Sequence, residues 1–179
     1  ETLLKTPFHA WHREHGGRLV DFAGWDMPVQ YTSITEEHTA VRTSIGLFDI
    51  AHMGRLTFSG PDAARLLDRL LTNDVAMLEP GSVRYALVCR DDGGILDDVL
   101  VYRFENDYLL VVNASNRLKI VDWIERHREG YDAEVTDRTA EWAMVAVQGP
   151  GAVDVVAARY QEIFAGMVDN VDQNLGRLR

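Results

Sequence analysis

A strand–Gly-Pro–helix pattern that occurs twice, 89 positions apart, constrains the fold of this 179-residue chain more than any other feature. In each copy an alternating apolar run leads into Gly-Pro, then an alanine and an amphipathic stretch: "RLTFSGPDAARLLDRL" and "MVAVQGPGAVDVVAAR". Proline suits the first turn of a helix, where its missing N–H costs nothing. Two copies are too few for a solenoid. The pattern therefore predicts an α+β chain of two similar small α/β lobes.

The segment "RDDGGILDDVLVY", Arg90–Tyr102, predicts a β-hairpin. Asp-Asp-Gly-Gly separates two strand-like runs, 82–90 and 95–104, and this composition is a strong turn signal. Aspartate tolerates the left-handed backbone region and glycine adopts it freely. Asp91 and Asp92 are therefore interpreted as turn residues that need no further function.

Other elements follow from periodicity and from start and stop residues. A short helix is expected within 4–20, ending at Gly16-Gly17, and the next run alternates like one strand that Pro28 closes. Further helices are expected at 33–46, 60–74 and 115–130, and further strands at 54–59, 107–114 and 132–149. Ser33 or Thr35 can cap the first of these helices.

Composition excludes several functions. The formal charge of −10 and the lack of any Lys/Arg-rich run disfavour nucleic acid as a partner. The single cysteine, Cys89, rules out an internal disulfide and fits a reducing compartment. No apolar run approaches the length of a membrane span, and the first residues lack the apolar core of a signal peptide. We expect a cytoplasmic protein, or one of the mitochondrial matrix if the source is eukaryotic.

Asp97 and Asp98 lie inside the second strand of the hairpin, where aspartate is depleted. Alternation places Asp97 with Val99 and Val101 on one face and Asp98 with Tyr102 on the other. The carboxylate that faces the apolar side loses solvation and needs a partner. Such surroundings shift pKa values and are where catalytic carboxylates are found. The residues alone leave two readings open, a functional carboxylate and a buried, hydrogen-bonded one.

Other chemistries find less support. The six histidines are scattered, and no histidine pair joins a carboxylate at metal-ligand spacing. His12 and His15 could share a helix face, yet a surface position explains them equally well. No Walker loop, dinucleotide-binding glycine motif or nucleophile elbow occurs. Cys89 lies in an apolar strand, where packing is the ordinary role. No metal site is predicted.

Six motifs occur together in an order and spacing that resemble one family: "TPFHAWHREHGGRLVDFAGWDMPVQY", "HTAVRTSIGLFDIAHMG", "LLTNDV", "GGILDDVLVY", "VVNASN" and "AVQGP". The chain resembles the N-terminal half of the glycine cleavage system T-protein family, over about residues 6–160. The resemblance implies a tetrahydrofolate-dependent aminomethyltransferase of one-carbon metabolism. Such a protein is expected to be a three-domain, cloverleaf-like molecule that binds tetrahydrofolate centrally. Its donor is the aminomethylated lipoyl group of the H-protein.

The resemblance also implies roles for individual residues. The second aspartate of the pair, Asp98, aligns with the family's catalytic carboxylate beside the pterin N5. There it could orient the amine, accept its proton and stabilise developing positive charge. The residues expected to line the folate site with Asp98 are Met53, Tyr85, Tyr102, Val111 and Asn113. Core packing remains an alternative for Met53 and Tyr85, and a cap or turn role for Asn113.

Two departures limit the resemblance. Ala51 stands where the family often has serine, which removes a hydroxyl near the expected pocket. The family's second half, with its C-terminal barrel, has no counterpart here, so the chain is expected to be truncated or a stand-alone half-domain. The alternatives are a folate module related to dimethylglycine- or sarcosine-oxidising enzymes, and a non-catalytic folate-binding half-domain. We expect a discontinuous outer lobe (1–48 and 139–179) and an inserted lobe (49–138) that carries the Asp-Asp strand.

Overall fold

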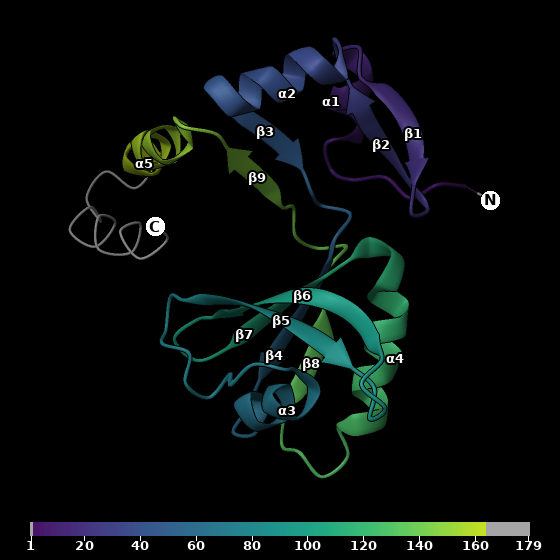
Figure 1. Ribbon diagram of the computed structural model, residues 1–179, viewed down its shortest axis with the longest axis vertical. Coiled ribbons are helices and arrows are strands. Elements are labelled where there is room, and N and C mark those ends of the chain that lie inside the picture. The colour runs from purple at the N-terminus through teal and green to yellow at the C-terminus, as the bar shows by residue number, and fades with distance from the viewer. Residues whose placement is uncertain (1, 164–179) are drawn as a thin grey trace. The chain divides into compact units, whose positions relative to one another are not determined.

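The computed structural model describes residues 2–163, and the chain divides into two compact units (Figure 1). Unit 1 is Glu1–Ala51 together with Ala143–Arg179, and unit 2 is the intervening His52–Trp142. Both units mix helices with antiparallel strands, so the predicted α+β class is confirmed. No helix among the described residues has both the length and the apolar character needed to cross a bilayer.

Unit 2 is built on a five-stranded antiparallel sheet of order β5-β6-β7-β4-β8. The strands are β4 (Gly54–Ser59), β5 (Val83–Cys89), β6 (Ile95–Arg103), β7 (Tyr108–Val112) and β8 (Glu134–Asp137). Helix α3 (Ala63–Leu70) follows β4, and the short η1 (Ala114–Asn116) leads from β7 into α4 (Arg117–His127). The central strands β7 and β4 are thus brought side by side from distant parts of the chain.

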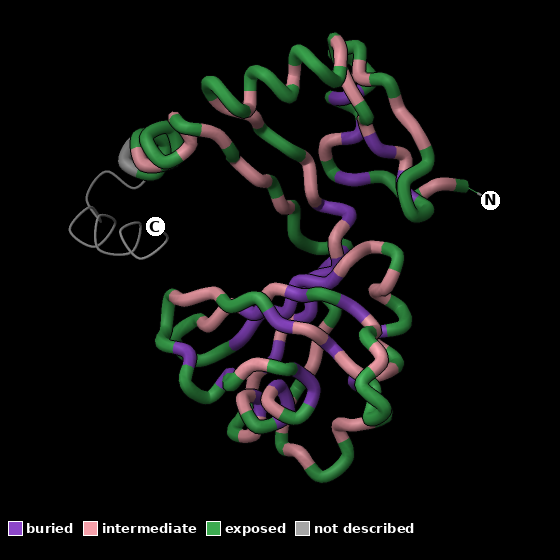
Figure 2. The backbone as a smooth tube through the Cα atoms, in the orientation of Figure 1, coloured by how far each residue is buried: buried purple, intermediate pink, exposed green. Residues whose placement is uncertain are grey.

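The core of unit 2 lies between one face of this sheet and helices α3 and α4 (Figure 2). Strand alternation sends every second residue of β4 and β6 inward, for example Phe58 at 0% and Val101 at 0% exposure. Leu66 and Leu67 of α3 and Ile120 of α4 meet them, each also at 0%. The residues on the opposite face of the sheet therefore do not belong to this core.

The hairpin predicted around Asp-Asp-Gly-Gly is confirmed. Strands β5 and β6 pair antiparallel, from Val83 opposite Tyr102 to Cys89 opposite Ile95. Gly93 adopts φ +84°, and the N–H of Gly94 donates to Asp92 Oδ1 at 2.8 Å. This bond and the Arg90 guanidinium lower the pKa of the Asp92 carboxyl below its ordinary value. Asp92 is accordingly a turn residue, as the Asp-Asp-Gly-Gly composition of this segment predicted.

In unit 1, helix α1 (His9–Glu14) precedes a hairpin of β1 (Arg18–Phe22) and β2 (Trp25–Gln30). Helix α2 (Ile34–Thr43) follows, and β3 (Gly46–Asp49) pairs antiparallel with β9 (Val145–Gln148), which leads into α5 (Ala152–Ile163). The single strand expected before Pro28 is wrong: Ala23 and Gly24 turn the chain with φ +53° and +81°. Pro28 lies inside β2, and the turn was missed because Ala-Gly is a weak hairpin signal.

The two Gly-Pro segments each join a strand to a helix, as the repeated pattern predicted. Gly60 follows β4 and Gly149 follows β9, with φ +100° and +118°. A Cβ at Gly60 would lie 2.7 Å from Asp132 O, and one at Gly149 would lie 2.4 Å from Ser44 O. Glycine is therefore required at both positions by backbone conformation and by close approach.

Replacing Ser33 by alanine is expected to destabilise unit 1 by about 1 kcal/mol, because Ser33 caps α2. Its Oγ accepts the Glu36 N–H at 3.2 Å and donates to Glu36 Oε2 at 2.9 Å. Denaturant unfolding measures the loss. Ser44→Ala at the other end of the same helix is the control, expected within about 0.5 kcal/mol of wild type. Equal losses in both variants would contradict the capping role.

Candidate functional site

Four of the predicted site residues lie on the sheet face of unit 2 that α3 and α4 leave uncovered: Tyr85, Asp98, Tyr102 and Val111. Ala86, Val88, Val99 and Val101 belong to the core, so alternation turns their neighbours Tyr85, Asp98 and Tyr102 to the other face. Register pairs Tyr85 with Leu100, and Leu100 with Val111, in one row across β5, β6 and β7. The sheet thereby brings together residues that lie up to 26 positions apart in the sequence.

The two strand aspartates face opposite sides, as alternation predicted. Asp97 is 3% exposed and lies on the core side, whereas Asp98 is exposed. The buried carboxylate has the partners that its burial requires. Its oxygens accept hydrogen bonds from the backbone N–H of Asn113 at 3.0 Å, from Asn113 Nδ2 at 2.8 Å and from Asn116 Nδ2 at 2.5 Å. Asp97 is therefore the buried, hydrogen-bonded aspartate of the pair.

Asp98 lies between two polar side chains. Its Oδ2 accepts the Tyr85 hydroxyl at 2.9 Å, and its Oδ1 accepts Asn113 Nδ2 at 3.0 Å. Asn113 Nδ2 also reaches the Asp98 carbonyl oxygen at 3.0 Å. These contacts fix the orientation of the carboxylate while leaving it accessible. An exposed carboxylate with a set direction can accept a proton or bind a cationic amine.

The predicted residues differ in how closely they join this centre. Asn113 is at the cap position of η1 but makes no capping bond with its side chain, because its amide binds the two aspartates instead. Tyr85 is 55% exposed, so core packing does not explain it. Val111 is buried at 2%, and Tyr102 is half-buried. Met53 is half-buried just before β4, and its carbonyl accepts a bond from Arg55 Nη1 at 2.6 Å.

The Tyr85 hydroxyl should report on Asp98 through its ionisation. The hydrogen bond to Asp98 is the main cause that raises the pKa of Tyr85 above its ordinary value. Asp98→Asn is expected to lower that pKa, as measured by alkaline titration of phenolate absorbance with Tyr85→Phe to identify the signal. The folded state raises this pKa, so the bond's stabilisation is present below the unfolded pKa and is lost as pH rises through the folded pKa. An unchanged Tyr85 titration in Asp98→Asn would contradict the contact.

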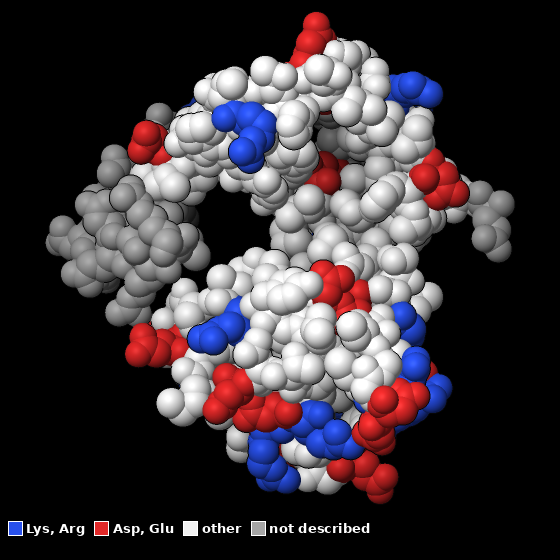
Figure 3. All heavy atoms as spheres, in the orientation of Figure 1, with Lys and Arg blue, Asp and Glu red and all other residues white. Residues whose placement is uncertain are grey.

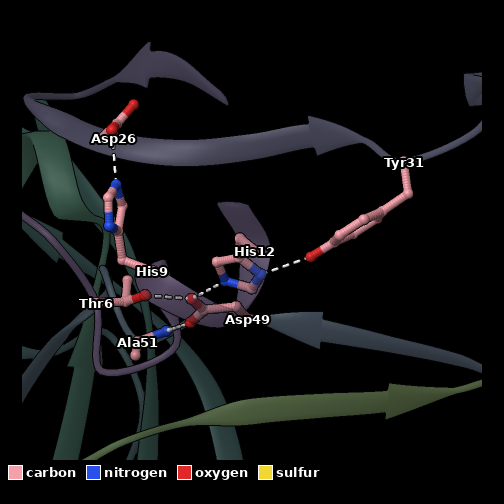
Figure 4. A network of polar contacts seen from close by, with 7 residues as sticks. All are labelled: Thr6, His9, His12, Asp26, Tyr31, Asp49 and Ala51. Carbon is pink, nitrogen blue, oxygen red and sulfur yellow. Dashed lines mark hydrogen bonds and ion pairs between the residues drawn. The ribbon is translucent and has the colours of Figure 1, made fainter. Parts of the chain in front are cut away.

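Unit 1 contains a second polar network that the sequence reasoning missed (Figure 4). His12 is 5% exposed, and its ring joins Tyr31 Oη at 2.5 Å to Asp49 Oδ2 at 2.8 Å. Asp49 also accepts the Thr6 hydroxyl at 2.5 Å and the Ala51 N–H at 2.9 Å. The surface position considered for His12 is therefore wrong. The partners lie 19 and 37 positions away, and no local spacing signals them.

The hydrogen bonds of this network connect α1 to Tyr31 and to Asp49 at the end of β3, which indicates a structural role. An ionised Asp49 can only accept, so Nε2 of His12 carries a proton, and in the neutral ring Nδ1 accepts the Tyr31 hydroxyl. Burial is the main cause that raises the pKa of Tyr31, with the charges of Asp49 and Glu37 adding to it. Tyr31 therefore stays a hydrogen-bond donor. The neighbouring His9 binds Asp26 Oδ2 at 2.7 Å in a separate pair.

The charged surface offers no single-sign patch on the face seen in Figure 3, where acidic and basic side chains lie next to each other over unit 2. Ion pairs at exposed positions of unit 2 include Arg69–Asp91 at 3.5 Å and Arg90–Asp92 at 3.2 Å. Among residues 2–163, no group of three or more His, Cys, Asp and Glu side chains could hold a metal ion.

Comparison with known proteins identifies relatives whose sequences are similar to this one. An aminomethyltransferase of Rubrobacter xylanophilus is 54% identical over 151 residues, which cover 84% of this chain and 41% of the relative. An aminomethyltransferase of Bacillus subtilis is 48% identical over 151 residues, with 84% and 41% coverage. The chain therefore spans about two fifths of the length of these curated relatives.

A solved structure has the same fold. The crystal structure of glycine cleavage system aminomethyltransferase T from Bartonella henselae superposes with a TM-score of 0.82 at 35% identity, over 87% of this chain and 43% of that protein. The family model of the GCVT N-terminal domain matches residues 8–165. The predicted resemblance is confirmed: this chain belongs to the GCVT N-terminal domain family, the N-terminal part of the glycine cleavage T-protein.

Proposed function

We propose that this chain carries the Asp98 site of a tetrahydrofolate-dependent aminomethyltransferase of the glycine cleavage system. The proposed reaction converts the aminomethyl-lipoyl H-protein and tetrahydrofolate to dihydrolipoyl H-protein, 5,10-methylenetetrahydrofolate and ammonia. One observation carries the proposal: an exposed carboxylate, held by Tyr85 and Asn113 on the open sheet face, in a chain of this family. The family membership supplies the reaction class, and the site supplies a group suited to it.

The residues of the open face fit a flat, polar ring such as a pterin. Tyr85 offers a half-exposed aromatic surface, and the half-buried Tyr102 adds apolar contact area in the neighbouring strand. Val111 is only 2% exposed and lies in the same row of the sheet as Tyr85 and Leu100. Met53 and Asn113 border the same end of β4 and β7. The pterin would supply the N5 nitrogen that receives the one-carbon unit. These six residues, Met53, Tyr85, Asp98, Tyr102, Val111 and Asn113, form the proposed folate site.

Asp98 is the proposed catalytic residue. Its carboxylate is accessible, and bonds from Tyr85 and Asn113 set its direction. A carboxylate in this setting can take up the proton that the transfer releases and stabilise positive charge near the transferred carbon. Tyr85 and Asn113 donate to Asp98 and so keep it an acceptor. The proposed compartment is the cytoplasm, or the mitochondrial matrix in a eukaryote, and the single cysteine suits either reducing setting.

A hybrid enzyme provides the test. In the hybrid, residues 8–165 of this chain replace the matching region of the Rubrobacter xylanophilus aminomethyltransferase, which is 54% identical to it. We expect the hybrid to release ammonia from aminomethylated H-protein in the presence of tetrahydrofolate. Folate binding without ammonia release, together with turnover of a dimethylglycine- or sarcosine-derived donor, would favour the related oxidising-enzyme modules instead. Folate binding with neither activity would indicate a non-catalytic module.

The 179-residue chain alone is expected to bind tetrahydrofolate at least about tenfold more weakly than the hybrid, a difference of about 1.4 kcal/mol. The chain spans about two fifths of its relatives' length, and we propose that the part of the relatives it does not cover contributes further folate contacts in the hybrid. Isothermal titration calorimetry of both proteins measures the difference. Equal affinities would place all of the folate contacts within this chain and contradict the prediction.

A further inference from the structure

The buried Asp97 has a set of contacts that extends beyond its own solvation. It lies on the core side of β6 at 3% exposure, yet its partners belong to the segment that follows β7. Oδ2 accepts the backbone N–H of Asn113 at 3.0 Å, and Oδ1 accepts its Nδ2 at 2.8 Å. Two bonds to one residue set both the backbone and the side chain of Asn113. A single satisfied bond would have met the requirement of burial with less constraint.

The orientation of the Asn113 amide follows from these contacts. Its Nδ2 faces three oxygens: Asp97 Oδ1 at 2.8 Å, and Asp98 Oδ1 and the Asp98 carbonyl at 3.0 Å each. Ionised carboxylates and carbonyls accept hydrogen bonds and cannot donate them. Turning the amide over would set its own oxygen against two carboxylates. The amide must therefore direct its NH₂ group toward both aspartates.

We propose that Asp97 is a positioning residue that acts through Asn113 to orient the Asp98 carboxylate. Asp97 locks the Asn113 amide, and that amide holds one oxygen of Asp98 while Tyr85 holds the other. The two adjacent aspartates thus have different proposed roles. The buried Asp97 positions Asn113, and the exposed Asp98 acts on the substrate. The inference rests on the proposed function insofar as Asp98 acts on substrate. Its structural content, the lock on the Asn113 amide, stands independently.

Asn116 supplies a matched control. Its Nδ2 also donates to Asp97 Oδ1, at 2.5 Å, but among the hydrogen bonds of residues 2–163 it makes none with Asp98. Asn116→Ala therefore removes a hydrogen bond from the same buried oxygen while leaving the Asn113 amide in place. If Asp97 had a purely structural role, the loss of kcat in Asp97→Asn and in Asn116→Ala would follow the loss of thermal stability in each variant.

In the hybrid enzyme, Asp97→Asn is expected to lower kcat by about 10–100-fold, because a small displacement of a reacting group has an effect of that size. The KM for tetrahydrofolate should change by less than about threefold, since the ground-state contacts of the folate remain. Asn116→Ala should keep kcat within about threefold of wild type. Parallel losses of kcat in both variants, in proportion to their melting temperatures, would overturn the proposal.

A reciprocal exchange separates support from positioning. The double variant Asp97→Asn with Asn113→Asp restores an amide–carboxylate pair between the two positions. We expect it to recover part of the melting temperature lost in Asp97→Asn. It should not recover kcat, because a carboxylate at position 113 cannot donate to Asp98. Recovery of kcat together with the melting temperature would show that Asp97 serves stability alone and would overturn the proposal.

A spectroscopic measurement on the 179-residue chain tests the lock without any activity. The two side-chain amide hydrogens of Asn113 should exchange slowly with solvent in ¹⁵N–¹H spectra, since both face acceptors. Asp97→Asn should speed that exchange by at least about tenfold, and Asn116→Ala should leave it near wild type. Unchanged exchange in Asp97→Asn overturns the proposal. An inactive wild-type hybrid with the expected exchange would contradict the proposed function and leave the Asp97 lock supported.

Discussion

Asp98→Asn in the hybrid enzyme is expected to lower kcat by about 10²–10⁴-fold, the range that a positioned acid–base group contributes. Asparagine retains the shape and one acceptor oxygen but removes the charge and the ability to take up a proton. The melting temperature should change little, because Asp98 is exposed and its bonds to Tyr85 and Asn113 lie at the surface. Steady-state ammonia release and thermal unfolding measure the two quantities on the same preparation.

Asp91→Asn is the control for this result. Asp91 is an exposed aspartate in the turn of the same hairpin, with a side chain 80% exposed, so the substitution removes the same charge without reaching the site. Its kcat should stay within about twofold of wild type, since surface substitutions away from special features have small effects. The Asp98 assignment fails if Asp98→Asn and Asp97→Asn lose activity equally and both are partly unfolded.

Asp49→Ala is expected to destabilise unit 1 by about 3 kcal/mol or more, because Asp49 is the shared acceptor of three donors and each buried donor left unsatisfied costs about 1–3 kcal/mol. The Asp49 side chain is 3% exposed, and His12 beside it is 6% exposed. The substitution leaves His12 Nε2, the Thr6 hydroxyl and the Ala51 N–H without their common acceptor. Each buried donor left unsatisfied adds its own desolvation cost.

Native-state hydrogen exchange is the suitable measurement, because two units can unfold separately and a single denaturation curve would then be hard to interpret. Amides of β3 and β9 should lose protection, whereas those of β6 and β7 in unit 2 should keep it. Asp26→Ala is the matched control. Asp26 also binds a buried histidine, His9, but its side chain is 26% exposed, so we expect a loss of about 1 kcal/mol or less. Equal losses of stability in Asp49→Ala and Asp26→Ala would contradict the prediction that Asp49 stabilises unit 1 as a shared acceptor.

Local signals in the sequence predicted local structure well. The turn at Asp92-Gly93 and the cap at Ser33 depend on residues within four positions of one another, and both are found. The repeated Gly-Pro pattern correctly marked where a strand passes into a helix in each unit. The hairpin at Ala23-Gly24 escaped because its turn residues are not the ones that favour such turns, and the flanking alternation continues through it.

The candidate site divides in the same way. Alternation alone placed Asp97 and Asp98 on opposite faces, since the side-chain period of a strand is two residues. It could not say which face the helices cover, because that depends on how α3 and α4 pack. The argument from burial pointed to the buried member of the pair, which is Asp97, whereas the family resemblance pointed to Asp98. The structure gives each a distinct environment, buried and bound by two asparagines for Asp97, and exposed between Tyr85 and Asn113 for Asp98.

The sequence by itself determined the α+β class, the hairpin that carries the two aspartates, and the family to which the chain belongs. These properties reside in residue order and short spacing, which a linear sequence contains in full. Only the tertiary structure decided that Asn113 joins Asp97 to Asp98, 16 and 15 positions away, and that His12 meets Asp49, 37 positions away. Such partners are selected by strand pairing and burial over the whole fold, because a buried polar group must find a donor or acceptor wherever the packed chain supplies one.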